Sequence, residues 1–255
     1  MDNNFKVHFK TVQTNAIKIL FETLKNILSD VTFKIDKSGI KLTSIDGTNK
    51  AIVSLFLEKE KFEEYVCTES TNVSLNLLSV FKIIKSVKNS DTVSFSIEKT
   101  EPYFIYVCHS NSDKRCKHST RLRLLDINDK IYQIPDIQFD SYITMSSNDF
   151  LSYISELAII SNDIVISNNS NKLILCSEGD FAKQTIEVAS STTAENLQEN
   201  KNFESGTFNI KYIQMFTKAS NLCNTVEIFI KNDYPLTLLY NVANLGNIKF
   251  CLIPN

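Results

Sequence analysis

The sequence predicts an α+β fold made of two copies of one domain, each with two helices on one face of a sheet. The first observation behind this is that the chain repeats itself at an offset of 133 residues, without a gap over long stretches. The second is that both halves show helical and strand periods in the same order. With 255 residues and 43% hydrophobic content, the chain can bury two cores of about 120 residues each.

The repeat is clearest between residues 73–97 and 206–230, which align without a gap. The same offset carries Asp30 onto Asp163 and Phe21 onto Ile154. Positions that are identical across the offset are Asn76/Asn209, Lys85/Lys218, Thr92/Thr225, Val93/Val226 and Ile97/Ile230. A duplicated domain is the economical interpretation.

Apolar spacing predicts four helices. Over residues 15–28 the large apolar side chains fall three or four residues apart, which makes one stripe of a helix. A second helix is predicted over 77–88. The offset places their counterparts at 148–160 and 210–220, where Ser147, Asn148 or Asp149 can cap the third helix.

Alternating or β-branched runs predict strands between these helices. The predicted strands are 31–35, 52–57, 93–97, 105–107, 164–166, 173–175, 226–230 and 236–240. Glycine-containing turns are expected at 37–39, 46–47 and 178–180, because glycine tolerates backbone angles that other residues avoid. A Ser, Thr, Asn and Glu-rich stretch, 190–205, is expected to be a mobile solvent loop without a catalytic role.

Composition, apolar run length and net charge exclude several classes of protein. No apolar run approaches the roughly 20 residues of a membrane span, and the first residues lack a signal-peptide core, so we expect an intracellular protein without a membrane partner. The six cysteines have no close paired spacing, and reduced thiols are expected. A net charge of −2 argues against a generally basic nucleic-acid binder, so any role on DNA requires charge gathered on one face.

The predicted helices carry such a charge. Their lysines are Lys18, Lys25, Lys82, Lys85, Lys88, Lys211 and Lys218. Against Glu22, Asp149 and Glu156 this leaves a net of +4, so the rest of the chain carries about −6. Lysine tips bind phosphates as point charges without reading sequence. The alternative is that they are ordinary solvated lysines.

Other chemistry is scarce, and we expect no catalytic residue, cofactor or metal. None of the five glycines forms a phosphate-binding loop, and the three histidines lack the H-E-x-x-H spacing. Cys108, His109, Cys116 and His118 could be drawn as a zinc site, but they lack the C-x-x-C spacing and are expected in a polar surface hairpin.

Four segments together resemble the eukaryotic sliding clamp, the proliferating cell nuclear antigen family. They are 42–55 (LTSIDGTNKAIVSL), 124–135 (LLDINDKIYQIP), 216–219 (FTKA) and 246–254 (GNIKFCLIP). The resemblance implies a closed trimeric ring of duplicated clamp domains, with helices inside around double-stranded DNA and a continuous antiparallel sheet outside. It implies a polymerase processivity factor without catalysis, working in the nucleus or, if viral, in a cytoplasmic replication factory. The implied domains are 1–123 and 139–255, joined by a connecting loop at 124–138.

The resemblance also assigns residues. All the helix lysines except Lys88, a local addition, would face DNA in a sequence-independent way, while the third helix offers only Asp149 and Glu156. DNA polymerase, the clamp loader and other clients would insert a short peptide motif into an apolar pocket. The pocket positions are Ile45, Ile52, Tyr132, Ile134, Pro135, Pro235, Cys251 and Ile253, with Cys251 standing where the family usually has an aromatic residue.

Subunits of the family join edge to edge, and the matching segments here are 117–123 and 178–184. The first is basic at Lys117, Arg121 and Arg123, and the second carries Glu178 and Asp180. This asymmetry favours a head-to-tail homotrimer. Three alternatives stay open: solvated edges of a monomeric or dimeric processivity factor, one member of a heterotrimeric checkpoint clamp, and an enzyme of unknown class.

Overall fold

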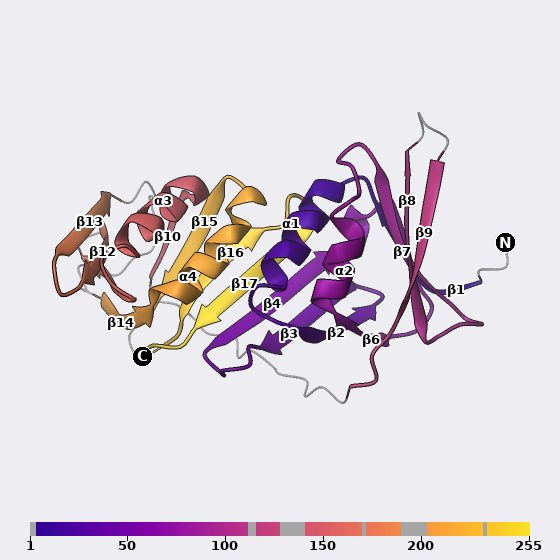
Figure 1. Ribbon diagram of the computed structural model, residues 1–255, viewed down its shortest axis with the longest axis horizontal. Helices are drawn as coiled ribbons and strands as arrows, with labels where there is room; N and C mark the ends of the chain where they lie inside the picture. The colour runs from indigo at the N-terminus through magenta and orange to yellow at the C-terminus, as the bar shows by residue number, and fades with distance from the viewer. Residues whose placement is uncertain (1–3, 112–115, 128–140, 170–171, 190–202, 232–233) are drawn as a thin grey trace. The chain divides into compact units, whose positions relative to one another are not determined.

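Figure 1 shows the computed structural model, which describes residues 4–111, 116–127, 141–169, 172–189, 203–231 and 234–255. The helices are α1 (Thr14–Leu24), α2 (Leu77–Ile84), α3 (Ser147–Leu157) and α4 (Ile210–Phe216), with 3-10 turns η1 (Lys59–Lys61) and η2 (Thr217–Asn221). The strands of the first half are β1 (Phe5–Thr11), β2 (Asp30–Asp36), β3 (Gly39–Ile45), β4 (Ala51–Glu58), β5 (Glu64–Cys67), β6 (Thr71–Asn76), β7 (Thr92–Glu98), β8 (Phe104–Asn111) and β9 (Cys116–Arg123). Those of the second half are β10 (Ser141–Ser146), β11 (Asp163–Asn169), β12 (Lys172–Glu178), β13 (Lys183–Ala189), β14 (Phe203–Asn209), β15 (Thr225–Ile230), β16 (Leu236–Asn241) and β17 (Gly246–Leu252).

The chain divides into two compact units. Unit 1 consists of Met1–Ser44, Ser54–Gln133 and Val242–Asn247. Unit 2 consists of Ile45–Val53, Ile134–Asn241 and Ile248–Asn255. Strands β4 and β17 therefore each supply residues to both units.

Unit 1 is built from antiparallel strands in the order β5-β1-β7-β8-β9 and from the run β4-β3-β2-β6. Helices α1 and α2 pack side by side in this unit (Figure 1). The apolar stripe of α1, with Ile17, Leu20 and Phe21, meets core side chains from both sets of strands, including Phe33 and Phe95. Burial of this stripe is what holds so short a helix in place, because a helix of three turns is marginal alone.

Unit 2 repeats this arrangement with the strand runs β10-β15-β16-β17 and β13-β12-β11-β14. Helices α3 and α4 pack together, and α3 buries Phe150, Ile154 and Leu157. The bounds of α1 and α3, of β2 and β11, and of β3 and β12 each differ by the 133 residues of the sequence repeat. The structure thus confirms the duplication. Among the described residues no helix is long and apolar enough to cross a membrane.

The helix ends differ from those predicted. Helix α2 ends at Ile84 because the chain turns there to bring Val87 into the core. Helix α4 ends at Phe216 and continues as η2. The cap of α3 is Ser146, whose hydroxyl accepts the amide hydrogen of Asp149 (3.3 Å). The predicted caps were wrong, since Ser147 is already helical and its buried hydroxyl hydrogen-bonds backbone carbonyls elsewhere.

The predicted strands are confirmed, but others were missed. No separate strand was predicted for β1, β3, β5, β6, β10, β14 or β17. The proposed edge segment 178–184 is not a strand, because β12 ends at Glu178 and β13 begins only at Lys183. Residues 190–202 of the expected loop lie outside the described residues, and residues 203–205 belong to β14.

Two glycines sit where the backbone of a neighbouring strand leaves no room. Gly39 (φ 147°) and Gly246 (φ 156°) adopt backbone angles that side chains rarely permit. A Cβ atom would lie 2.0 Å from the Leu57 carbonyl oxygen at Gly39 and 2.0 Å from the Phe56 carbonyl oxygen at Gly246. Gly47, by contrast, has nothing within 4 Å of that position. The first two glycines therefore permit close strand packing, whereas Gly47 serves a turn.

Gly246→Ala is expected to lower the free energy of unfolding by about 2 to 4 kcal/mol, because both the backbone angle and the clash with Phe56 are unfavourable. Gly47→Ala is the matched control and should change it by about 0.5 kcal/mol or less. Urea titration at one protein concentration measures both. Equal midpoints for the two variants would contradict this account of Gly246.

Candidate nucleic-acid interface and partner surfaces

Three of the predicted DNA-binding lysines form a ladder on unit 1. Lys82 lies on α2, Lys85 caps the end of that helix and Lys88 follows in the next turn, so they recur every three residues. All three are exposed, and none forms a salt bridge with a described residue. The C-terminal end of a helix favours cations. These ammonium groups are therefore available to bind phosphates.

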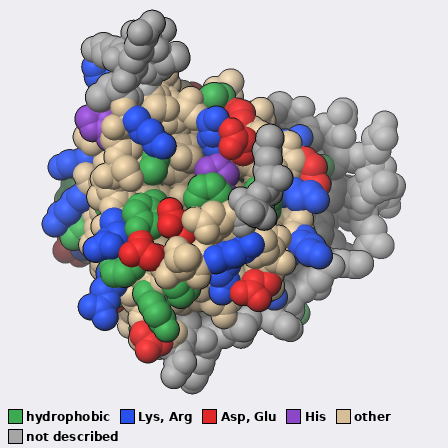
Figure 2. All heavy atoms as spheres, turned by 90° about the vertical axis from the view of Figure 1, so that its right-hand side faces the viewer, with side chains coloured by type: hydrophobic (Ala, Val, Ile, Leu, Met, Phe, Trp, Pro, Cys, Tyr) green, Lys and Arg blue, Asp and Glu red, His purple; other side chains and the backbone are tan. Residues whose placement is uncertain are grey.

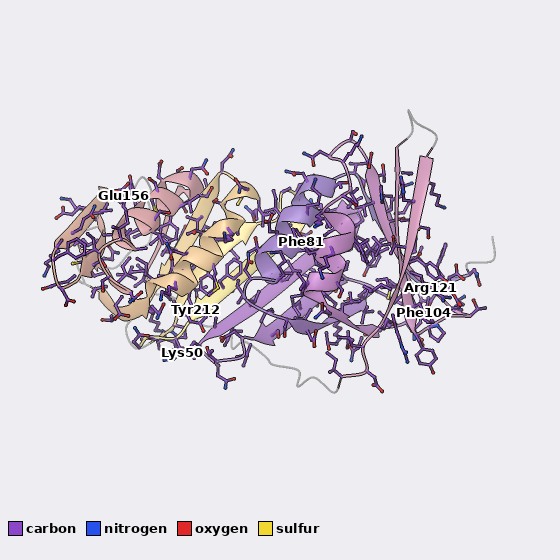
Figure 3. The ribbon with its side chains drawn as sticks, in the orientation of Figure 1. Lys50, Phe81, Phe104, Arg121, Glu156 and Tyr212 are labelled. Carbon is purple, nitrogen blue, oxygen red and sulfur yellow. The ribbon has the colours of Figure 1, made fainter. Side chains whose placement is uncertain are left out.

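Lys18 and Lys25 instead have partners within unit 1. The half-buried Lys18 ammonium donates to the Val87 carbonyl (3.0 Å) and to the Asn89 side chain (2.8 Å). The Lys25 ammonium lies 4.6 Å from the ring centroid of Phe81, which Figure 3 labels on α2. Both lysines brace α1 against α2 and the turn after it. The sequence did not reveal these contacts, because their partners lie some 55 to 70 positions away.

The helices of unit 2 carry a different balance of charge. Lys211 on α4 and Lys218 on η2 are exposed, and so are Asp149 and Glu156 of α3. Figure 3 labels Glu156, whose carboxylate accepts a hydrogen bond from the Ser152 hydroxyl (3.2 Å). These four charges sum to zero. The helical segments of unit 1 hold five lysines and one acidic residue, Glu22, which gives a net charge of +4. The net positive charge predicted for the four helices together is therefore concentrated in unit 1.

A buried carboxylate orders the loop between β3 and β4. Asp46 is 6% exposed, and one of its oxygens accepts the amide hydrogens of Lys50 (2.8 Å) and Ala51 (2.7 Å). The other oxygen accepts from the Thr48 amide (3.0 Å), the Thr48 hydroxyl (2.6 Å) and the Tyr212 hydroxyl (2.9 Å). Burial raises the pKa of Asp46, but these hydrogen bonds outweigh it and hold the pKa below its ordinary 3.8.

Tyr212 comes from α4, so this hydrogen bond ties the loop to a helix of the same unit. Figure 3 labels Tyr212 and Lys50, at the two ends of the network. The sequence predicted a turn at 46–47 but missed Tyr212, which is 166 residues away. The only sequence signal was an aspartate directly before glycine.

The predicted partner pocket is described in part, and those residues all belong to unit 2. Ile253 is 38% exposed, and Ile45, Ile52 and Pro235 are half-buried. The amide of Ile253 donates to the Lys50 carbonyl (3.0 Å), which places this apolar residue beside the loop that Asp46 orders. Tyr132, Ile134 and Pro135 lie outside the described residues.

Cys251 does not offer the surface expected of a pocket residue. Its side chain is buried (5% exposed), and the thiol sulfur accepts a hydrogen bond from the Thr237 hydroxyl (3.4 Å) on β16. Burial also raises the pKa of this thiol. Cys251 therefore packs within the unit, against Thr237.

Strand β9 is one of the two end strands of its sheet in unit 1, the other being β5. Its basic residues Lys117, Arg121 and Arg123 are exposed. The Arg121 guanidinium donates to the Glu101 carboxylate (3.2 Å) and lies 4.4 Å from the ring centroid of Phe104, a pair that Figure 3 labels. Figure 2 views the molecule from the side on which β9 is drawn in Figure 1, and its blue, red and green side chains are interspersed there.

The second strand of the predicted subunit contact is β13, an end strand of its sheet in unit 2. The turn before it holds exposed Asp180 and the 74% exposed Phe181. Glu178 forms a salt bridge with Lys183 across this turn (2.8 Å). The predicted acidic edge is therefore a turn, and the free backbone edge is that of β13, because the chain reverses direction between Glu178 and Lys183.

The histidine and cysteine cluster lies in the β8–β9 hairpin. The His109 ring stacks on His118, with centroids 4.4 Å apart, and its Nδ1 atom lies 3.4 Å from an Asp91 oxygen. In the described ranges no three His, Cys, Asp or Glu side chains are grouped so as to hold a metal ion. Because the two rings are stacked, the lone pairs of their nitrogens lie in parallel planes and do not point at one ion.

Comparison with known proteins gives two adjacent family matches and close relatives. The model of the proliferating cell nuclear antigen N-terminal domain matches residues 6–131, and that of the C-terminal domain matches residues 133–255. The chain is 32% identical over 257 residues to a probable DNA polymerase sliding clamp 1 of Paramecium bursaria Chlorella virus 1, covering 99% of this chain and 98% of that protein. It is 29% identical over 247 residues to the proliferating cell nuclear antigen of Chaetomium thermophilum, covering 95% of each.

Asp46→Ala is expected to lower the free energy of unfolding at pH 7 by about 2 to 4 kcal/mol, because it leaves several donors without an acceptor. Tyr212→Phe removes only one of these hydrogen bonds and should cost about 1 kcal/mol. The folded pKa of Asp46 is depressed, so its contribution is present above pH 3.8 and is lost as the pH falls below that value. Urea titrations at pH 7 and pH 3 measure this, and an equal effect of Asp46→Ala at both would contradict it.

Proposed function

Since the chain belongs to the proliferating cell nuclear antigen family, we propose that it acts as a DNA sliding clamp. In this proposal three copies close into a ring around duplex DNA and tether a DNA polymerase as a processivity factor. The family consists of non-catalytic scaffolds, and the clamp acts by topology and binding. We place its work in DNA replication and repair, in the nucleus or in a cytoplasmic viral replication factory, with domains at 1–123 and 139–255 and the connecting loop at 124–138.

The observation that carries the DNA part is the lysine ladder of unit 1. Lys82, Lys85 and Lys88 are exposed, evenly spaced and without a salt bridge to any described residue. Ammonium groups attract backbone phosphates without distinguishing bases, which suits a protein that must move along the duplex. Lys211 and Lys218 add charge on unit 2, where Asp149 and Glu156 offset it.

The partner surface is proposed to lie around Ile253, Ile45, Ile52 and Pro235. These side chains keep apolar surface outside the core, and Ile253 is hydrogen-bonded to the loop that Asp46 holds rigid. A rigid apolar site is suited to aromatic anchors of a short peptide. The proposed occupants are peptide motifs of the polymerase, the clamp loader and other replication proteins.

The ring is proposed to close head to tail through β9 of one copy and β13 of the next. Both are end strands with unpaired backbone edges. Two different edges on one chain favour a cyclic assembly over a symmetric dimer. A monomeric or dimeric factor, or one member of a heterotrimeric checkpoint clamp, would be distinguished by the mass of the pure protein in light scattering.

The function is tested by asking whether the protein encircles DNA. The protein is incubated with a clamp loader, ATP and nicked circular plasmid, and the DNA-bound fraction is isolated by gel filtration before and after the plasmid is cut once. A sliding ring should stay on the circle and be released from the linear DNA. Equal retention on both forms would overturn the proposal.

The DNA track is tested with two variants that each remove two charges per copy. Lys82→Ala/Lys85→Ala should weaken duplex association about tenfold at moderate salt and flatten its salt dependence, because each lost phosphate contact lowers the slope by about 1. Lys211→Ala/Lys218→Ala should have a smaller effect, since acidic residues already offset these lysines. Fluorescence anisotropy of labelled duplex across a salt titration measures this, and identical curves for both variants would count against a track on unit 1.

The partner surface is tested with Ile253→Asp. A charge at this apolar site should weaken binding of an aromatic-anchored polymerase peptide by about 2 kcal/mol or more, while fold and assembly are unchanged. Val12→Asp is the control, because Val12 is also exposed (55%) but belongs to unit 1. Calorimetric titration of both variants decides the point, and unaltered binding by Ile253→Asp would place the site elsewhere.

A further inference from the structure

We infer the register in which two copies pair: Arg123 of β9 lies opposite Phe181 of the next copy, Arg121 opposite Lys183, and Lys117 opposite Glu187. This rests on the proposed ring and adds to it the residues that face each other. The inference comes from the internal repeat, because the chain already contains one example of the strand pairing that its free edges lack.

The repeat relates β9 to β17 and β13 to β4. The run β7-β8-β9 has the order of β15-β16-β17, and β4-β3-β2-β6 has the order of β13-β12-β11-β14. Strands β9 and β13 each end a sheet, whereas β17 and β4 are hydrogen-bonded neighbours. The pairing of β17 with β4 is therefore a template for that of β9 with β13 of a second copy.

The register of the template is fixed at both ends. Within unit 1 the amide of Glu58 donates to the carbonyl of Leu245 (2.8 Å), and within unit 2 the amide of Ile253 donates to the carbonyl of Lys50 (3.0 Å). The eight-residue step from Lys50 to Glu58 matches the eight-residue step from Leu245 to Ile253. Both hydrogen bonds thus belong to one antiparallel register without a bulge.

Lys50 of the template corresponds to Phe181. The amide of Asp46 donates to the Ala51 carbonyl (2.9 Å), and its repeat counterpart Gly179 donates in the same way to Ala182 (2.9 Å). Ala51 therefore corresponds to Ala182. The residue before each is Lys50 in the first copy of the repeat and Phe181 in the second.

Ile253 of the template corresponds to Arg123. Val93 pairs with His109, which pairs with His118 on β9. The repeat counterpart Val226 pairs with Tyr240, and the hydrogen bond between Thr237 and Cys251 sets the facing residues of β16 and β17.

Because Thr237 faces Cys251, counting three residues along each strand puts Ile248 opposite Tyr240. Tyr240 corresponds to His109, which pairs with His118, so His118 corresponds to Ile248. Five residues further along, Arg123 corresponds to Ile253. The template bond from Ile253 to Lys50 becomes one from the Arg123 amide to the Phe181 carbonyl of the next copy.

This register matches exposed residues with exposed residues at three positions and half-buried with half-buried at one. On β13 the exposed residues are Lys183, Thr185 and Glu187, and they fall opposite exposed residues of β9. Half-buried Leu122 falls opposite half-buried Ala182 on the other face. A slip of one residue in either direction would place half-buried Leu122 opposite an exposed residue, Phe181 or Lys183.

The charges fit as well. Glu187, whose carboxylate lies 3.2 Å from Lys172 in the single chain, meets Lys117 of the other copy. Arg121 and Lys183 face each other as like charges, but each has its own carboxylate, Glu101 at 3.2 Å and Glu178 at 2.8 Å.

The remaining pair is Arg123 and Phe181. Phe181 is 74% exposed in the single chain, which is unusual for so large an apolar side chain. In the inferred register its ring meets the Arg123 guanidinium, which favours an aromatic face. The register thus gives partners to two side chains that are exposed in the single chain.

A disulfide trap tests the register. Directly opposite residues of an antiparallel pair bring their Cα atoms to about 5.5 Å, within reach of a disulfide, whereas a shift of four residues along a strand, about 13 Å, does not. Arg121→Cys/Lys183→Cys should therefore give a covalent ladder ending at three chains on a non-reducing gel after mild oxidation. Arg121→Cys/Glu187→Cys is the off-register control and should stay as single chains. The wild-type chain and the single variants give the background from the native cysteines.

The outcomes separate the register from the ring. Crosslinking of the control instead, or of neither pair in a protein that light scattering shows to be trimeric, would overturn the register and leave the ring standing. A monomeric wild-type protein at all concentrations would overturn both.

Discussion

The unpaired backbone edges of β9 and β13 are the constraint on which the other features of this protein depend. Every strand has hydrogen-bonding groups on both sides, and a sheet that ends in solvent leaves one row of them unused. The duplicated domain satisfies this requirement once within the chain, where β4 and β17 are neighbours, whereas the equivalent edges of β9 and β13 have no neighbouring strand in the part of the chain that the structure describes. In the proposed ring, the edge of β9 in one copy would pair with that of β13 in the next.

The close packing of strands also explains why two positions on neighbouring strands are glycine. Gly39 and Gly246 lie where the carbonyl of a neighbouring strand occupies the place of a Cβ atom. The loop between β3 and β4 is held differently, by the buried carboxylate of Asp46 and its five hydrogen bonds. This network joins a loop beside Ile253 to Tyr212 on α4, so the proposed partner surface and a helix of the same unit are connected through one buried carboxylate.

The distribution of charge shows that duplication of a fold does not require duplication of its surface. Helices α1 and α3 have bounds that match across the repeat, yet the charges of α1, Lys18 and Glu22, cancel, while α3 carries Asp149 and Glu156. Buried stripes such as Ile17 and its counterpart Phe150 are kept apolar because both cores need them. Exposed positions are free of that requirement, and the two helical surfaces have diverged in charge.

The sequence by itself determined the duplication, the four helices, many of the strands, the basic lysines and the family, because periodicity and repeat are properties of residues close together in the chain or at one fixed offset. The tertiary structure decided which end strands stay open, that Ser146 rather than Ser147 caps α3, that Lys18 and Lys25 brace α1, and that Cys251 is buried. These features depend on partners far along the chain. The hydrogen bond from Tyr212 to Asp46 spans 166 residues, and no local pattern encodes such a contact.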